Sequence, residues 1–294
     1  MMIGYDRAMR RTFGRRTFDF DRQVAVMAVI NRTPDSFFDR GATFELGAAL
    51  AAGERALAEG ADWLDVGGVK VGPGPEVTEA EELDRVVPLI EALRASTDAV
   101  ISVDTFRAGV ARRALEAGAD VVNDPSGLHD PKVAEAAAEA GAGLVVVHTG
   151  GPPRTRPHRP AYTDVAEEVR AFLTDRAAIA RQRGVPAERL IVDPGHDLHK
   201  NTFHSLELTR RLERVAGLGH PLLVALSNKD FIGETLDLPL ELRLEASLAA
   251  AVVSVLKGAN IVRVHQVAPT VRALRMTEAI LGWLPPAATR RGLA

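Results

Sequence analysis

The sequence predicts an α/β fold, a (β/α)8 barrel of the TIM type with a short N-terminal hairpin. Short apolar segments alternate with longer Ala-rich segments eight times along the 294 residues. The short segments are continuous apolar runs, as expected of parallel strands that are buried on both faces. No Gly-x-Gly-x-x-Gly motif follows the first barrel strand, which disfavours the alternative of a doubly wound sheet. A barrel of this kind takes about 250 residues as a single domain.

The N-terminal residues are expected to form an arm that precedes the barrel. Phe18 and Phe20 alternate with polar neighbours close to Gly14, a pattern typical of a short hairpin. We expect the hairpin to cover one open end of the core. A basic patch for a partner is the alternative, because arginines are frequent here. The expected organisation is an arm or hairpin over residues 1–22, a barrel over residues 23–284 and a tail over residues 285–294.

Each apolar run in the remaining sequence is assigned a strand and each Ala-rich segment a helix. The predicted strands are 24–30, 63–66, 100–103, 121–122, 144–147, 190–192, 221–225 and 261–264. The predicted helices are 47–59, 79–95, 107–117, 131–140, 162–183, 203–215, 240–257 and 270–281. Several helices are followed by Gly-Ala, where the glycine can adopt the left-handed conformation that closes a last turn. The Pro-, Arg- and Gly-rich loop 150–160 is expected to be an ordered, lid-like crossing.

Composition excludes several classes of function. The net charge of −3 and the pI near 6.3 give no basic field for nucleic acid. The absence of cysteine excludes disulfides, thiolate nucleophiles and Cys-ligated zinc, and fits a cytoplasmic protein. The longest apolar run, near residues 248–256, is too short to span a bilayer. We therefore expect neither a nucleic-acid partner nor a membrane.

The segment Leu190–Lys200 introduces the candidate site, because a short apolar strand there ends at Asp193 and is followed by Pro-Gly. Asp193 alone could simply cap the turn. In a barrel, however, the C-terminal ends of all strands gather on one face. That ring would contain Asn31, Asp65, Asp104, Asn123, His148, Asp193, Ser227, Lys229, Arg263 and His265. So many polar groups at one mouth are hard to explain as capping.

The residue types in this ring suit a particular ligand. Asp104, Asn123 and Asp193 offer carboxylate and amide groups that suit a flat heterocycle with N–H donors and C=O acceptors. Arg263 and His265 lie two apart on one strand and offer positive charge for an anion such as phosphate. With a phosphate, the amide oxygen of Asn31 would suit Mg²⁺ better than Zn²⁺. Histidine and carboxylate spacing gives no convincing zinc trio, and no Gly-x-Ser-x-Gly elbow of a serine hydrolase occurs.

Seven short motifs appear in the order found in the dihydropteroate synthase family of pterin-binding barrels, which the sequence resembles over about residues 24–282. The motifs are Val29–Phe37, Asp65–Gly68, Ile101–Thr105, Val122–Asp124, Asp193–Gly195, Ala225–Lys229 with Phe231–Gly233, and Val262–His265. One such motif is weak evidence, whereas seven in register identify the fold and the pterin pocket.

The resemblance implies a transferase of folate biosynthesis that joins p-aminobenzoate to 6-hydroxymethyl-7,8-dihydropterin diphosphate and releases diphosphate. Asp104, Asn123, Asp193 and Lys229 would hold the pterin, and Asp104 and Lys229 would serve catalysis, with Asp104 stabilising a cation on the pterin methylene. The remaining implied roles are Mg²⁺ at Asn31, diphosphate at Arg263 and His265, and p-aminobenzoate near Ser227. The resemblance also implies a homodimer, for which the eighth helix and its neighbours are the expected face.

The loops beside the pocket depart from the family pattern. After Asp65–Gly68 the usual Glu-Ser-Thr-Arg-Pro-Gly is replaced by Val69–Gly74, which loses a Thr and an Arg, although Lys70 could restore a charge. Asn228 replaces a stacking Arg, and Asp197–Lys200 replaces Gly-Phe-Gly-Lys. The expected pterin contacts are therefore kept, whereas the second-substrate loops are rewritten.

These departures leave a second hypothesis beside the synthase, namely a divergent paralogue that keeps the pterin pocket without making dihydropteroate. Such a protein could bind, regulate or use another acceptor. A third class, the methyltetrahydrofolate methyltransferases, releases no diphosphate. Ser227-x-Lys229 and Arg263-x-His265 argue against it.

Overall fold

The computed structural model describes residues 9–34, 41–155 and 159–291 and contains the expected barrel. Its parallel strands are β3 (Ala25–Asn31), β4 (Trp63–Gly67), β5 (Val100–Asp104), β6 (Val121–Asp124), β7 (Gly143–Val147), β8 (Leu190–Asp193), β9 (Leu223–Val224) and β10 (Ile261–Val264). They form one sheet in the order β8-β7-β6-β5-β4-β3-β10-β9. A bridge between Val192 and Leu222 joins the two edge strands, so the sheet closes almost completely.

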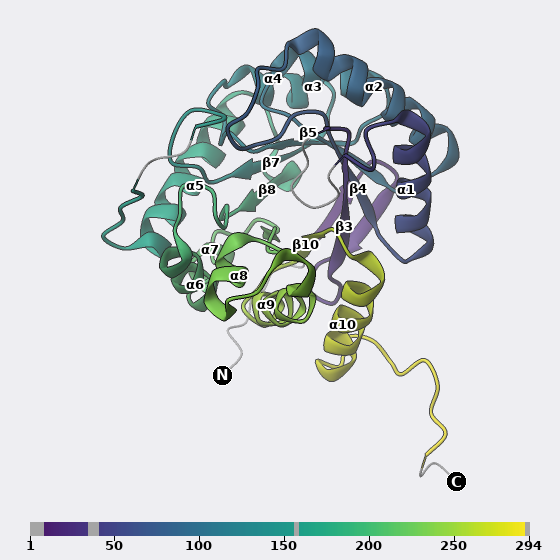
Figure 1. Cartoon of the computed structure of the whole chain (residues 1–294), viewed down its shortest axis with the longest axis vertical. Coiled ribbons are helices and arrows are strands. Elements are labelled where there is room, and N and C mark those ends of the chain that lie inside the picture. The colour runs from purple at the N-terminus through teal and green to yellow at the C-terminus, as the bar shows by residue number, and fades with distance from the viewer. Residues whose placement is uncertain (1–8, 35–40, 156–158, 292–294) are drawn as a thin grey trace.

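Helices surround the strands in Figure 1, where α10 lies next to α9. The α-helices are α1 (Leu46–Ala58), α2 (Glu79–Ser96), α3 (Ala108–Glu116), α4 (Lys132–Glu139), α5 (Val165–Gln182), α6 (Thr202–Arg210), α7 (Glu213–Ala216), α8 (Asp230–Leu236), α9 (Leu244–Leu256) and α10 (Val267–Ile280). Two 3-10 turns, η1 (Ala187–Arg189) and η2 (Leu240–Leu242), precede β8 and α9. None of the helices in the described part combines the length and the apolar character needed to cross a bilayer.

Side chains of successive strand residues alternate between two cores, as the period of two requires. On β3, Val26 and Ala28 face the helices, whereas Ala25 and Met27 face the barrel interior. Both sets are buried, which explains why the strands read as continuous apolar runs. The polar residues at the strand ends are thus carried on elements that are fixed on two sides.

The predicted hairpin is present and closes the N-terminal end of the barrel. It consists of β1 (Arg10–Phe13) and β2 (Arg16–Asp19), which pair antiparallel around Gly14 at φ 54°. Phe13 and Phe18 are buried against Trp63 of β4, with ring centroids 5.1 and 5.7 Å apart. A side chain at Gly143 would collide with the Phe13 ring, which lies 2.7 Å from an ideal Cβ there. The hairpin is therefore part of the interior core.

Some predicted elements differ from the observed ones. The single helix expected over residues 203–215 is interrupted at Arg211, whose guanidinium bonds both carboxylate oxygens of Asp164 at 2.9 and 3.0 Å. The seventh strand is only Leu223–Val224, since Pro221 has no N–H to add to the ladder. The helix expected over residues 240–257 begins as η2 and continues as α9. Helix α8 was not predicted and follows Lys229 directly.

Four expectations extend beyond the described residues. The motif Val29–Phe37 continues past residue 34, so its residues 35–37 lie outside them. Residues 1–8 of the predicted arm, 156–158 of the predicted crossing and 292–294 of the predicted tail lie outside them as well.

Candidate active site

Three predicted site residues lie at the C-terminal ends of barrel strands and are buried. Asp104 and Asp193 are the last residues of β5 and β8, and Asn123 is the next-to-last residue of β6. Asp104 on β5 lies opposite Asn123 on β6, and Asp193 on β8 lies opposite Val147 on β7. Parallel strands bring their C-terminal ends to one edge, which is why residues distant in sequence share this mouth. The sequence-based prediction placed these three side chains together, and they do line the same end of the barrel.

Each of these three side chains keeps one acceptor oxygen unused among the described residues. Asp104 bonds through Oδ2, and Asp193 accepts Gly195 N–H through Oδ1 at 2.7 Å. Asn123 donates through Nδ2 to Asp65, while its Oδ1 is buried without a partner. A buried acceptor without a partner is costly, so Asn123 Oδ1 points to a ligand that supplies an N–H group. Together with the unused oxygens of Asp104 and Asp193, it suits a flat ring with several N–H donors.

Arg263 lies at the centre of an ion-pair cluster. Its Nε donates to Asp65 Oδ2 at 2.6 Å, and its terminal nitrogen Nη2 donates to Asp104 Oδ2 at 2.9 Å. Asp65 is fully buried and also accepts bonds from Ser102 and Asn123. Asp65 was in the predicted ring but was not assigned a role. An arginine inside an apolar strand needs a buried carboxylate partner. Arg263 in the strand 261–264 could therefore have indicated a role for Asp65 as its partner.

Burial sets the charge properties of this cluster. Desolvation raises the pKa of Asp104 to about 8, Arg263 opposes the shift and Asp65 adds to it. Desolvation also raises the pKa of Asp193, and the nearby cation of Lys229 opposes that change. The pKa of Lys229 is lowered by burial, with Asp197 and Asp193 acting in the opposite direction. Perturbed groups gathered in one cleft are typical of functional sites.

The open part of the mouth is a cavity of about 240 Å³. Five of the predicted site residues line it, namely Asn31, Asp104, Lys229, Arg263 and His265. Asn123, Asp193 and Ser227 do not line it. Ser227 instead bonds His265 through its hydroxyl, 3.1 Å from Nδ1. Lys70 lies on the lining, as expected for a residue that could restore the charge of the altered loop.

Leu198 lies between this cavity and the apolar barrel interior. Its side chain packs against the interior core and also lines the cavity. The altered loop thus places an apolar side chain on the wall of the mouth.

The loop that carries Leu198 is held in an unusual backbone conformation. Asp197 and His199 have φ values of 61° and 54°, a region that costs residues with a Cβ about 1–2 kcal/mol each. The Asp197 carboxylate accepts bonds from Ser205 Oγ at 2.9 Å and Phe231 N–H at 3.1 Å. His199 is held at Nδ1 by Thr149, 2.9 Å away. These partners, distant in sequence, fix the loop after Asp193.

Lys200 and Lys229 hold the same loop from inside. Lys200 Nζ donates to the carbonyl oxygens of Gly195 and Leu198 at 2.9 and 3.1 Å, and Lys229 Nζ donates to the His196 carbonyl oxygen. Lys229 was predicted to touch the pterin edge. In the structure its amine contacts the backbone of the loop after Asp193, and the residue also lines the mouth cavity.

The other altered loops also have structural partners. Asn228 is fully buried at φ 58° and donates to Gln266 Oε1 at 2.9 Å, so it does not take the place of an exposed stacking arginine. Arg154 donates to the carbonyl oxygens of Lys70 and Pro75 at 3.3 and 2.6 Å. The β7–α5 loop therefore crosses above the β4–α2 loop, as its composition predicted.

The residues offer little to hold a metal ion on their own. No group of three His, Asp or Glu side chains with ligand spacing occurs within residues 9–34, 41–155 and 159–291. Asn31 lines the cavity, and its side-chain oxygen lies 3.0 Å from the position of a Cβ at Gly67. One amide oxygen fits Mg²⁺ only as part of a complex in which phosphate oxygens and waters supply the other ligands.

Comparisons with known proteins agree with this geometry. Residues 27–265 match the profile of the family described as pterin binding enzyme. The chain is 52% identical over 280 residues to a Mycobacterium leprae protein named inactive dihydropteroate synthase 2, covering 93% of this chain and 96% of that protein. It is 40% identical over 257 residues to the dihydropteroate synthase of Escherichia coli K12, covering 87% and 91%. The Yersinia pestis dihydropteroate synthase, solved with a sulfonamide drug, superposes with a TM-score of 0.89 at 38% identity, covering 93% and 99%.

Proposed function

The chain belongs to the pterin-binding enzyme family, within the dihydropteroate synthases, and we propose that its barrel mouth binds a pterin diphosphate and joins it to p-aminobenzoate. One observation carries the proposal. Asp104, Asn123 and Asp193 each keep an acceptor oxygen unused among the described residues, in a mouth that also holds Lys229 and Arg263. The amino-pyrimidine edge of a pterin supplies N–H donors of the kind that these oxygens require.

In the proposed reaction the bond between the pterin methylene carbon and the diphosphate oxygen breaks, and its electron pair leaves with diphosphate. The p-aminobenzoate nitrogen then donates its lone pair to the methylene carbon and loses a proton. Asp104, which faces the mouth, would stabilise the positive charge that develops on the carbon. Arg263 keeps one terminal nitrogen without a hydrogen bond to any described residue, and with His265 it would bind diphosphate oxygens.

Magnesium is part of the proposal as a partner of the diphosphate. The amide oxygen of Asn31 would hold the ion together with diphosphate oxygens and waters. The ion would neutralise charge on the leaving group. No further ligand from the chain is needed in this arrangement.

A homodimer is also proposed, with α9 and α10 as its face. These helices pack side by side and carry exposed apolar side chains. The side chains are Val253, Leu256, Met276 and Ile280. The variant Ile280→Asp should be monomeric in light scattering. The control variant Leu236→Asp changes an exposed leucine on α8 and should leave the dimer intact. A dimer in both variants would place the interface elsewhere.

A second function is favoured by Leu198 and its loop. The loop is held at Asp197, His199 and Lys200 and places Leu198 on the lining of the mouth cavity. This arrangement suits a paralogue that keeps the pterin site without condensing it with p-aminobenzoate, in a binding or regulatory role or with another acceptor. The relative named inactive at 52% identity supports the same alternative.

A direct assay separates the two functions. Purified protein is incubated with the pterin diphosphate, Mg²⁺ and p-aminobenzoate, and dihydropteroate is measured by mass spectrometry, while calorimetry measures pterin binding. Product formation supports the synthase. Pterin binding without product supports the paralogue, and the absence of both would refute the pterin site.

A further inference from the structure

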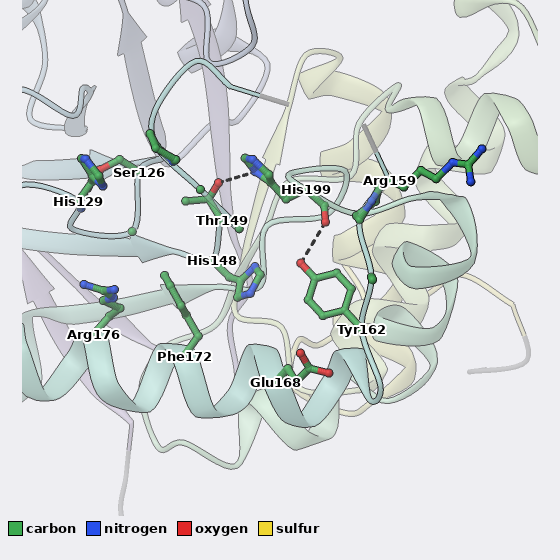
Figure 2. A pocket seen from close by; sticks show the side chains of 16 residues that line it. Ser126, His129, His148, Thr149, Arg159, Tyr162, Glu168, Phe172, Arg176 and His199 are labelled. Atoms are coloured by element: carbon green, nitrogen blue, oxygen red, sulfur yellow. Dashed lines mark hydrogen bonds between the residues drawn. The ribbon is translucent and has the colours of Figure 1, made fainter. Parts of the chain in front are cut away.

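A second cavity, of about 680 Å³, lies beside the barrel mouth. It is bordered by the β6–α4 loop, the β7–α5 loop and the first half of α5 (Figure 2). Asp104, Asn123, Asp193, Lys229 and Arg263 are not among its lining residues. Its volume lies in the range typical of sites for small organic ligands. The cavity is therefore a separate candidate site.

His148 presents a fixed donor to this cavity. The residue is only 4% exposed, and Lys200 Nζ lies 2.8 Å from its Nδ1. Two carbonyl oxygens complete the surroundings of Nζ. Burial lowers the pKa of Lys200, and Asp193 and Asp197 act in the opposite direction. In its charged form the amine has three hydrogens, which match the three acceptors. Nδ1 of His148 then accepts, and its proton resides on Nε2. That N–H donates to none of the described residues.

Aromatic rings enclose the His148 imidazole. Figure 2 shows it between Phe172 and Tyr162, at centroid distances of 4.7 and 6.1 Å. Burial, with the charge of Lys200, lowers the pKa of His148 to about 2, so the ring is neutral at physiological pH. This wall offers a flat apolar surface with one N–H donor.

Positive charge lies next to the same aromatic wall. The guanidinium of Arg176 lies 5.0 Å from the centroid of Phe172, and its Nε is buried without a hydrogen bond. Arg176 makes no hydrogen bond to the described part of the chain, and its nearest carboxylate oxygen, on Asp175, is 3.8 Å away. His129 lies on the same side of the cavity as Arg176 in Figure 2. Unused donors thus face the cavity from two directions.

The single carboxylate on the lining, Glu168, is engaged through one of its two oxygens. Its Oε1 accepts the N–H groups of Thr163 and Asp164 at 2.7 and 3.0 Å, at the start of α5. Figure 2 shows Glu168 on the Tyr162 side of the cavity, away from Arg176 and His129. Arg159 extends away from His148 in Figure 2 and is not needed for the site. The part of the lining near Arg176 and His129 therefore offers donors.

We propose that this cavity binds a small anion that carries a flat ring, of about the size of a mononucleotide. The anionic group would accept bonds from Arg176, His129 and His148 Nε2–H, since a guanidinium suits phosphate and carboxylate equally. The ring would lie against Phe172 and Tyr162. This site is independent of the pterin site and of its chemistry.

Calorimetry with adenosine monophosphate tests the proposal on the full-length protein. Adenosine and inorganic phosphate serve as part-ligands, and benzoate tests a carboxylate in place of a phosphate. We expect the monophosphate to bind one site per chain and Arg176→Gln to weaken it by about tenfold or more. Arg181→Gln, the same change on the same helix but away from the cavity, should leave the affinity within about twofold. Binding of benzoate alone would support the anion site and assign a carboxylate ligand.

Other outcomes would overturn the site. One is the absence of binding by both adenosine monophosphate and benzoate. Another is an affinity that falls with His265→Asn at the barrel mouth and not with Arg176→Gln, which would place the anion in the mouth. Equal losses for Arg176→Gln and Arg181→Gln would indicate only a general charge effect. If Arg176→Gln melts early, His148→Asn provides the second variant, and unchanged binding there would refute the assigned donor.

Discussion

Replacing Asp104 by asparagine keeps the size of the side chain and removes the negative charge that the carboxylate carries above its pKa of about 8. The carboxylate pairs with Arg263 at 2.9 Å and leaves Oδ1 available to a ligand. A hydrogen bond to a charged group contributes about 1.5–3 kcal/mol, which predicts roughly 10- to 150-fold weaker pterin binding. If the protein turns over, loss of the charge facing the cation should slow the reaction by about 10²–10³-fold.

The fold should survive this substitution. Arg263 retains Asp65 at 2.6 Å, so the arginine is not left without a counter-charge. We therefore expect a loss of roughly 1–3 kcal/mol in the free energy of unfolding, well below the effect of stranding a buried charge. Urea unfolding followed by circular dichroism measures this loss.

Asp230→Asn is the matched control. Asp230 lines the same cavity but its side chain is 71% exposed, and it pairs with Arg243 at 3.2 Å. We expect changes within about 0.5 kcal/mol in both binding and stability. Asp193→Asn is a second test that leaves Arg263 untouched. Wild-type pterin affinity in both Asp104→Asn and Asp193→Asn, with intact folds, would refute the pocket assignment.

Three further predictions concern other parts of the chain. Pterin affinity should rise with pH up to about pH 8 and level off above, because the ligand's N–H groups prefer ionised Asp104; calorimetry in Asp104→Asn should show a smaller rise, since Asp193, whose pKa is also raised, remains. Leu198→Ala should strengthen pterin binding by vacating the mouth, and weaker binding would show that Leu198 supports the ligand instead. Phe18→Ala should cost about 3–5 kcal/mol in urea unfolding, whereas an unchanged midpoint would mean that the hairpin is dispensable.

The barrel and its ring of polar residues could be predicted because they depend on local patterns. A run such as Leu190–Val192 predicts a buried strand, and parallel strands necessarily bring Asp104 and Asp193 to one end. The (β/α)8 fold and the hairpin are confirmed, whereas the ligand roles of the ring residues and the domain bounds stay predictions.

The conformation of the loop after Asp193 could not be predicted in this way. Asp197 is held by Ser205 and Phe231, and His199 by Thr149, all distant in sequence. Nothing in the local pattern indicates that two residues with side chains adopt positive φ values there. Helix α8 was missed for a simpler reason, since its seven residues are too few to show a helical period.

The cavity beside α5 was also invisible in the sequence. His148 was placed in the ring of strand ends, but its ring is turned toward Phe172 and Tyr162 because Lys200 occupies its other side. The orientation of the His148 side chain thus depends on tertiary contacts with a buried lysine. It cannot be predicted from the order of residues in the sequence.

The hairpin at the barrel floor has a consequence for biosynthesis. Phe13 and Phe18 are synthesised before their partner Trp63 and the neighbouring Gly143. The Phe20 carbonyl oxygen accepts from the side-chain amide of Asn260, which is synthesised later still. The apolar side chains of the hairpin thus stay without their native cover until these later residues are made, which exposes them to chaperones and to aggregation.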